Sequence, residues 1–175
     1  MKFWGIVVLL FIASITYKIS NANKPNNIQG ASQPTISFTF DDGKTNTLGG
    51  VPMKVWHHKI LNTLDKHHIK AIMYVAGHNK TTTQGKYVLS TWNNAGHFIA
   101  NHTLNHPNFN DSSITLKKYE QEFLLNDALI RQYSNYIKFF RFPYLKEGNT
   151  KEKVEGFRLF LKQQAYKNLF LTIDF

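Results

Sequence analysis

The sequence feature that most constrains the fold is an alternation of short, strand-like apolar stretches with longer stretches of helical spacing. The predicted strands are 35–40, 71–75, 97–100, 138–142 and 168–173, and the predicted helices are 55–68, 86–94, 115–136 and 151–164. The strands are rich in β-branched and aromatic residues, and a helix separates each strand from the next. This alternation predicts an α/β fold with a mostly parallel sheet.

The N-terminal segment has the pattern of a signal peptide. Lys2 precedes an almost wholly apolar stretch at 3–15, and Ser20-Asn21-Ala22 provides the small residues that a signal peptidase reads. Because a membrane span needs about 20 apolar residues, we expect cleavage after Ala22 and a secreted or periplasmic protein without stable membrane insertion. An uncleaved membrane anchor formed by residues 3–17 remains an alternative, as does a buried core helix.

The rest of the chain divides into a polar lead-in and one folded domain. Asn, Gly, Ser and Pro dominate the segment after the signal peptide, as in a linker. The predicted segments are therefore a signal peptide at 1–22, a linker at 23–33 and a folded domain at 34–175.

Composition limits the partners and the chemistry. The formal charge is +10, which favours anionic partners such as a cell-wall polymer, although a solvated basic surface explains it equally. No run of five Lys or Arg residues occurs, so we expect no nucleic-acid partner. The chain has no cysteine, so any metal must be held by His, Asp or Glu.

The first candidate for chemistry is Asp41-Asp42-Gly43, directly after the first predicted strand. Catalytic groups of parallel α/β folds gather at the carboxyl ends of strands. A metal that takes one carboxylate as a ligand would leave the other free as a general base. The alternative is an ordinary turn, because Asp and Gly are common turn residues.

The second candidate is the pair His102 and His106, after the third predicted strand. On a helical turn, residues at this spacing lie on one face about 6 Å apart and can bind one metal. Two His and one Asp leave coordination positions open, as in catalytic zinc sites. The other histidines are predicted to be solvated or packed: His57, His58, His67, His68, His78 and His97.

The third candidate is Arg141-Phe142-Pro143-Tyr144, at the carboxyl end of the fourth predicted strand. Arg141 offers a fork of donors that can orient a carboxylate. Pro143 stiffens the loop, and the backbone N–H of Tyr144 would be available to an oxyanion. A surface Arg before a turn is the alternative.

These three motifs, in this order and at these strand ends, resemble those of the NodB-homology polysaccharide deacetylases, carbohydrate esterase family four. The family motif T-F-D-D-G occurs at Thr39–Gly43, H-[ST]-x-x-H at His102–His106 and R-x-P-Y at Arg141–Tyr144. The resemblance covers residues 35–175. It implies a distorted (β/α) barrel, usually of seven strands, of which about five are present here.

The resemblance also implies roles for the matched residues. A divalent metal, commonly zinc, would be bound by Asp42, His102 and His106. Asp41 would be the general base, Arg141 would orient Asp41, and the Tyr144 N–H would help hold the oxyanion. The implied reaction removes an acetyl group, more often N-acetyl than O-acetyl, from a glycan. Peptidoglycan, chitooligosaccharide, acetylxylan and exopolysaccharide remain open as substrates.

Two further family motifs lack a full counterpart. The fourth, which supplies an Asp and a Trp, is matched only by Asp174, and the fifth, L-x-H, which supplies the general-acid His, is not found after the fourth predicted strand. The last predicted strand also lacks a covering helix, whereas parallel sheets are normally covered on both faces. We therefore expect the chain to stop before the end of its domain. Either it is a piece of a longer active enzyme, or it is a truncated metal- or glycan-binding protein with weak or no turnover.

Overall fold

The structure, a computed structural model, describes residues 36–170. The predicted signal peptide and linker lie outside the described residues, as does Asp174. The strands are β1 (Thr39–Asp42), β2 (Ile72–Val75), β3 (Phe98–Asn101), β4 (Tyr136–Phe140) and β5 (Lys167–Asn168). The helices are α1 (Met53–Lys66), α2 (Thr83–Asn94), α3 (Leu116–Ile130) and α4 (Lys151–Gln163), with short 3₁₀ turns η1 (Gly77–Asn79) and η2 (Pro143–Leu145). No helix between residues 36 and 170 is long and apolar enough to cross a membrane.

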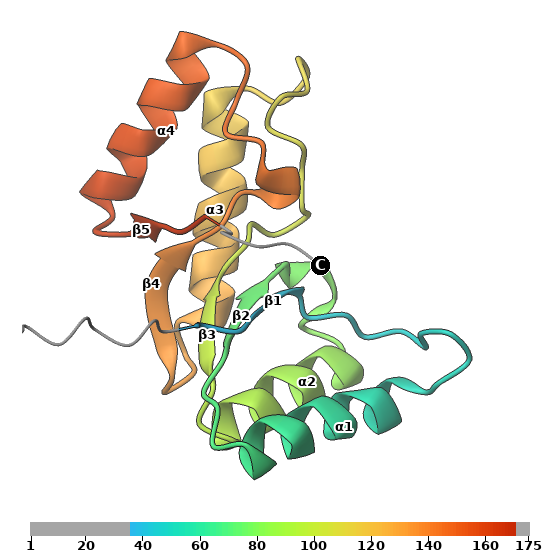
Figure 1. Ribbon diagram of the computed structural model, residues 1–175. Helices are drawn as coiled ribbons and strands as arrows, with labels where there is room; N and C mark the ends of the chain where they lie inside the picture. The colour runs from blue at the N-terminus through green and yellow to red at the C-terminus, as the bar shows by residue number, and fades with distance from the viewer. Residues whose placement is uncertain (1–35, 171–175) are drawn as a thin grey trace, which may run out of the picture. The chain divides into compact units, whose positions relative to one another are not determined.

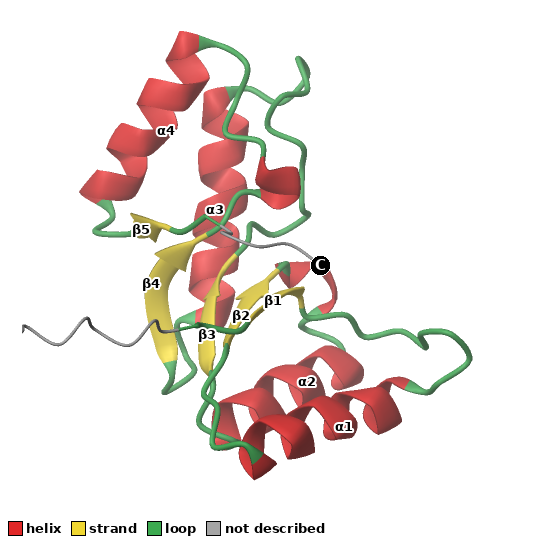
Figure 2. Cartoon of the chain, in the orientation of Figure 1, coloured by secondary structure: helices red, strands yellow, loops and turns green. Residues whose placement is uncertain are grey.

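The described strands form one parallel sheet in chain order, β1-β2-β3-β4-β5 (Figures 1 and 2). Because every crossover moves in the same direction, right-handed connections put the helices on the same face of the sheet. This arrangement is the wall of a (β/α) barrel rather than a doubly wound sheet, in which the strand order reverses. The predicted α/β fold with about five strands of a distorted barrel is confirmed.

Two apolar clusters pack the helices onto the sheet. The first joins α1 and α2 to the first three strands and has Trp92, Leu89 and Ile99 at its centre. The second is largely aromatic and joins α3 and α4 to β4, with Phe123, Phe140 and Phe157 almost fully buried. Burial of each such side chain stabilises the fold by about 1.5–3 kcal/mol. The two clusters anchor the strand ends from which the candidate residues project.

The boundaries of most elements differ from the prediction by a few residues, and the differences at β1 and β4 concern the candidate site. The first strand was expected at 35–40, but β1 includes both aspartates, and Asp41 and Asp42 pair in register with Tyr74 and Val75. The carboxylates therefore extend from the strand itself, because the parallel ladder with β2 continues to its last residue. The fourth strand likewise lies at 136–140 rather than 138–142.

The third helix was expected to reach residue 136, but α3 ends at Ile130. A turn follows that is held by Asn93 at the end of α2. The Asn135 N–H donates to Asn93 Oδ1 at 3.0 Å, and Asn135 Nδ2 donates to the Asn93 carbonyl at 2.7 Å. These long-range bonds satisfy polar groups of the turn, so residues 131–135 can lead the chain from the helix into β4.

Candidate metal centre and active site

The C-terminal end of β1 presents two carboxylates with different environments. Asp42 adopts a left-handed backbone conformation, with φ of 67°, and Gly43 follows with φ of 64°. Asp tolerates this region better than most residues, and Gly adopts it freely. The turn bends the chain away from the sheet, so that Asp41 and Asp42 face different partners across the strand ends.

His102 and His106 lie in an irregular loop after β3, not on a helical turn. Thr103 and His106 have φ of 65° and 56°, which an α-helix does not permit. The expected helical turn is therefore wrong, although the two imidazole rings do meet, with centroids 4.9 Å apart.

Contacts with α3 and η1 determine the shape of this loop. The Leu104 N–H donates to the Glu122 carbonyl at 3.1 Å, and Asn105 donates to the Glu122 carboxylate from its backbone N at 2.6 Å and from Nδ2 at 2.8 Å. On the other side, the His78 N–H donates to the Leu104 carbonyl at 2.8 Å. These bonds, made by residues distant in sequence, replace the backbone bonds of a helix and hold both rings in place.

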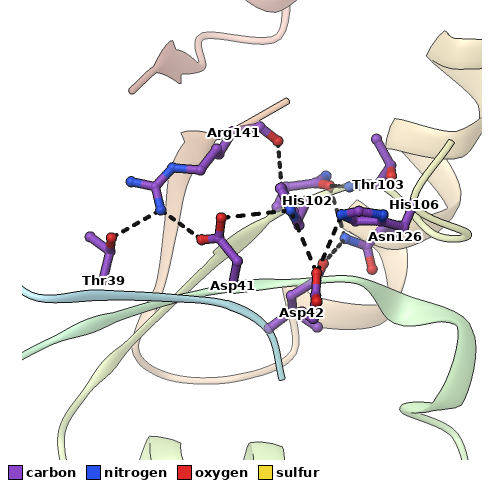
Figure 3. A network of polar contacts seen from close by, with 10 residues as sticks. Thr39, Asp41, Asp42, His102, Thr103, His106, Asn126 and Arg141 are labelled. Atoms are coloured by element: carbon purple, nitrogen blue, oxygen red, sulfur yellow. Dashed lines mark hydrogen bonds and ion pairs between the residues drawn. The ribbon is translucent and has the colours of Figure 1, made fainter. Parts of the chain in front are cut away.

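Three side chains converge on one point, as Figure 3 shows. Asp42 Oδ1 lies 3.3 Å from His106 Nε2 and 3.7 Å from His102 Nε2. One ligand atom from each residue lies within 4.8 Å of the others. Tetrahedral zinc, with bonds of about 2.0–2.1 Å, spaces its ligands roughly 3.4 Å apart. The observed separations are close to this spacing.

The protonation of His102 tests whether these residues fit a cation. Its Nδ1 lies 2.7 Å from the Arg141 carbonyl, which can only accept, so Nδ1 carries the proton of the neutral ring. Burial lowers the pKa of His102 below 6.5, outweighing the opposite effect of Asp41, so the ring is neutral at pH 7 and its Nε2 presents a lone pair. Asp42 Oδ1, which faces that lone pair, is buried without a hydrogen-bond partner among the described residues. Two acceptors that face each other without a proton between them fit a bound metal ion.

Arg141 links the second carboxylate to the sheet. Its Nη1 donates to Asp41 Oδ1 at 2.6 Å and to Thr39 Oγ1 at 2.9 Å (Figure 3). The guanidinium also lies over the ring of Tyr74, 4.0 Å from its centroid, and the side chain is 3% exposed. Burial raises the pKa of Tyr74 to about 12, so this ring stays neutral beneath the cation. Asp41 thereby keeps a fixed orientation, with Oδ2 3.9 Å from His102 Nε2.

Tyr144 lies beside the centre rather than among the converging groups. It lies in η2 with φ of 55°, and its ring packs edge-on against that of His106 at 4.6 Å. A pocket of about 330 Å³ opens next to the same histidine. Its lining residues are Asp42, Lys44, Thr45, Asn46, Ala76, His78, Asn79, Lys80 and His106. We call this cavity the Lys80 pocket.

The remaining histidines lie outside the converging group. His57 is buried and bonds Thr91 Oγ1 at 2.8 Å, His97 packs against Trp92, and the exposed His58 contacts Tyr87. His78 is exposed at the Lys80 pocket. Packed or solvated surroundings were predicted for all of these. His67 and His68, however, lie beyond the end of α1 and not on it.

Sequence reasoning assigned no role to four residues that shape the site. Thr39 and Tyr74 hold Arg141, Glu122 holds the histidine loop, and Lys80 lines the pocket. Thr39 begins the matched T-F-D-D-G motif and shares a strand face with Asp41, two residues away, and these two signals could have identified its role. The other three become neighbours of the site only through the fold.

Both the sequence and the fold of the chain resemble those of known proteins. The family model described as polysaccharide deacetylase matches residues 29–157. A curated relative, the peptidoglycan-N-acetylglucosamine deacetylase of Bacillus cereus, is 29% identical over 110 residues, which are 62% of this chain and 36% of the relative.

Solved structures agree with this match. A peptidoglycan N-acetylglucosamine deacetylase in complex with 4-naphthalen-1-yl-N-oxidanyl-benzamide is 25% identical with a TM-score of 0.58, over 75% of this chain and 54% of the other. A family 4 carbohydrate esterase from Streptomyces lividans in complex with acetate is 21% identical with a TM-score of 0.60, over 79% and 63%. The chitin deacetylase of Colletotrichum lindemuthianum is 19% identical with a TM-score of 0.61, over 79% and 55%. The last two likenesses concern the fold alone, and the chain spans only part of the length of each relative.

Proposed function

The chain belongs to the polysaccharide deacetylase family, in its NodB-homology group, and from this premise we propose that it is a metal-dependent hydrolase that removes acetyl groups from a glycan. N-acetyl groups are the preferred target in this proposal, and O-acetyl groups are secondary. The names of two relatives, both peptidoglycan N-acetylglucosamine deacetylases, support an acetylated glycan as the substrate.

The main support for metal dependence is the orphaned acceptor pair at the centre of the site. Asp42 Oδ1 lies 3.7 Å from the His102 Nε2 lone pair and 3.3 Å from His106 Nε2, and it accepts no hydrogen bond from the described residues. Leaving a buried carboxylate oxygen unpaired costs free energy, and a divalent cation ligated by Asp42, His102 and His106 removes that cost. Two nitrogen ligands and one oxygen ligand suit zinc, which is the metal we propose.

Each remaining residue has a proposed role in acetyl hydrolysis. A divalent metal in this site would supply Lewis-acid polarisation of the acetyl carbonyl and a more acidic water. Asp41 would accept the proton of the attacking water, because Arg141 holds Oδ1 and leaves Oδ2 directed toward the proposed ligands. The same carboxyl group would return this proton to the leaving nitrogen as the bond between the acetyl carbon and the nitrogen breaks. The backbone N–H of Tyr144 would donate to the oxyanion that develops on the carbonyl oxygen. Arg141 acts through Asp41 and is thus a positioning residue.

The place of action in this proposal is outside the cytoplasm. A secreted or periplasmic location rests on the signal-peptide pattern of residues 1–22. Anchoring by residues 3–17 is the alternative. The intact mass of the protein from its native source distinguishes the two, because cleavage after Ala22 removes the first 22 residues.

Acetate release by the full chain tests the proposed function. We expect release from N-acetylchitotetraose to exceed that from acetylated xylooligosaccharide, to stop after treatment with a chelator and to return with added Zn²⁺. His106→Ala should abolish release, whereas His58→Ala, which changes an exposed His on α1, should not. Release that continues in the chelator would exclude metal dependence. A zinc-loaded protein that releases acetate from neither substrate would refute the activity.

A further inference from the structure

The Lys80 pocket, which adjoins two of the three proposed ligands, contains a buried cation that the proposed reaction does not use. Lys80 is only 3% exposed, and it lines the cavity together with Asp42 and His106. Lysine is almost never so buried unless it is paired. The partner of this ammonium group is therefore expected to be a ligand that binds in the pocket.

The fold holds Lys80 firmly in this position. Its backbone N–H donates to the Gly77 carbonyl at 2.8 Å, and the first turn of α2 packs so closely that a Cβ at Gly85 would lie 2.4 Å from Lys80 Cα. The side chain then runs past Gly43, where a Cβ would lie 3.1 Å from Lys80 Cε. Because neither glycine has a side chain, Lys80 can pack closely against both. This close packing fixes the lysine stem and preorganises its charge.

No described residue neutralises that charge by direct contact. Asp42, whose charge raises the pKa of Lys80, pairs with His102 and His106 instead. Burial outweighs this attraction and lowers the pKa of Lys80 to about 8, so the group is still mainly protonated at pH 7. A metal ion on Asp42 would add positive charge to the same wall of the pocket. A buried cation without a close counter-ion is costly, and an anion that enters the pocket removes this cost.

The other side chains of the pocket suit a charged sugar rather than a bare ion. Lys44 adds a second, exposed cation at the rim, and Thr45, Asn46 and Asn79 offer hydroxyl and amide groups. Such groups bind sugar hydroxyls, and the charge of +10 on the whole chain steers anionic polymers toward the protein.

We propose that the Lys80 pocket is a subsite for an anionic substituent, a carboxylate or a phosphate, on or next to the acetylated sugar of the glycan. This inference rests on the proposed function and narrows it, because it makes acidic glycans the preferred substrates. Lys80 is the specificity-determining residue in this account. An ammonium group binds as a point charge and does not by itself distinguish a carboxylate from a phosphate. The experiment therefore tests each of these two anions.

Binding and turnover of matched glycans test the subsite with the zinc-loaded full chain. The probes are two matched pairs: a tetrasaccharide of alternating N-acetylglucosamine and glucuronate with neutral N-acetylchitotetraose, and N-acetylglucosamine 6-phosphate with neutral N-acetylglucosamine. Calorimetry measures binding and acetate release measures kcat/KM. We expect the glucuronate probe, the phosphate probe or both to bind at least tenfold more tightly than the neutral glycan of the same length at low salt, and the advantage to shrink as salt rises.

Variants assign that preference to Lys80. Lys80→Met keeps an apolar stem and should reduce the ratio of acidic to neutral binding about tenfold, a change of about 1.4 kcal/mol, whereas Lys80→Arg should retain most of the preference. Lys86→Met is the matched control, because Lys86 is exposed on the neighbouring α2, and it should leave the ratio unchanged. Thermal melting verifies that each variant is folded.

The outcomes separate this inference from the proposed function. Acetate release with equal affinity for acidic and neutral glycans would refute the subsite and leave the deacetylase standing. Tight, Lys80-dependent binding of an acidic glycan without acetate release would support the subsite and refute the activity. An acidic preference that survives in Lys80→Met would place the anion elsewhere and overturn the inference.

Discussion

Replacing Arg141 by Lys separates the orientation of Asp41 from the binding of the metal. The Arg141 side chain makes two hydrogen bonds through Nη1, to Asp41 and Thr39, and lies over the Tyr74 ring. Its backbone carbonyl, which the substitution leaves in place, accepts the His102 Nδ1 proton. Arg141→Lys therefore changes the orientation of the proposed base, Asp41, and leaves intact the backbone hydrogen bond that orients the proposed metal ligand His102.

The size of the effect follows from these contacts. A hydrogen bond to a charged group contributes about 1.5–3 kcal/mol, and stacking of the guanidinium on an aromatic ring contributes about 0.5–2 kcal/mol. Lysine keeps the charge but loses the fork and the stacking. We expect the free energy of unfolding to fall by about 2–3 kcal/mol, since Asp41 is one-third exposed and its pairing is partly screened. A misdirected base should lower kcat by about 10²–10⁴-fold.

Three assays on the same preparation measure these effects: denaturant unfolding for stability, acetate release for kcat, and metal content by mass spectrometry. The expected result is a folded protein that still binds one metal ion and has lost most of its turnover. Full activity of Arg141→Lys would show that Arg141 does not position the base. Loss of the metal together with activity would show that the side chain supports the ligands, contrary to the bonding pattern of the site.

Two further predictions concern stability. Burial and, to a lesser extent, the charges of His58 and His97 lower the pKa of His57 to about 4. Because the unfolded chain takes up a proton at this residue near pH 6.5, the contribution of neutral His57 to the free energy of unfolding is present above pH 6.5 and is lost as the pH falls from 6.5 to 4. His57→Gln should make the free energy of unfolding less dependent on pH in that window by about 3 kcal/mol, and equal pH profiles of the two proteins would contradict this. Asn126 donates to the Val75 carbonyl at 2.7 Å and to Asn101 at 2.8 Å. Asn126→Ala should therefore lower the free energy of unfolding by about 2–3 kcal/mol, whereas the exposed control Asn149→Ala should change it by less than about 0.5 kcal/mol.

The fold and the converging residues were accessible from the sequence because the signals are local. Alternating strand and helix patterns identify the parallel sheet, and the three motifs directly follow, or end, strands whose carboxyl ends meet at one edge. The aspartate pair, His102 and His106 could therefore be grouped from their strand positions, without knowledge of the loops between them, whereas the choice of Asp42 over Asp41 as the ligand came from the resemblance to the family.

Features set by contacts distant in sequence could not be predicted. The histidine loop is not helical because Glu122 of α3 supplies its bonding partners. The end of α3 depends on Asn93 of α2, and nothing near Lys80 indicates that the lysine is buried beside Gly43. In each case the deciding partner lies far along the chain, where local patterns carry no information about it.

The most direct test of the metal-dependent deacetylase is a comparison of two adjacent substitutions, Asp41→Asn and Asp42→Asn, measured for bound zinc and for acetate release from N-acetylchitotetraose. Asp41→Asn should retain one zinc ion and lose turnover, because Asp41 is the proposed base, whereas Asp42→Asn should lose both, because Asp42 is a proposed ligand. Full activity in Asp41→Asn, or undiminished zinc binding in Asp42→Asn, would contradict the assignment of base and ligand.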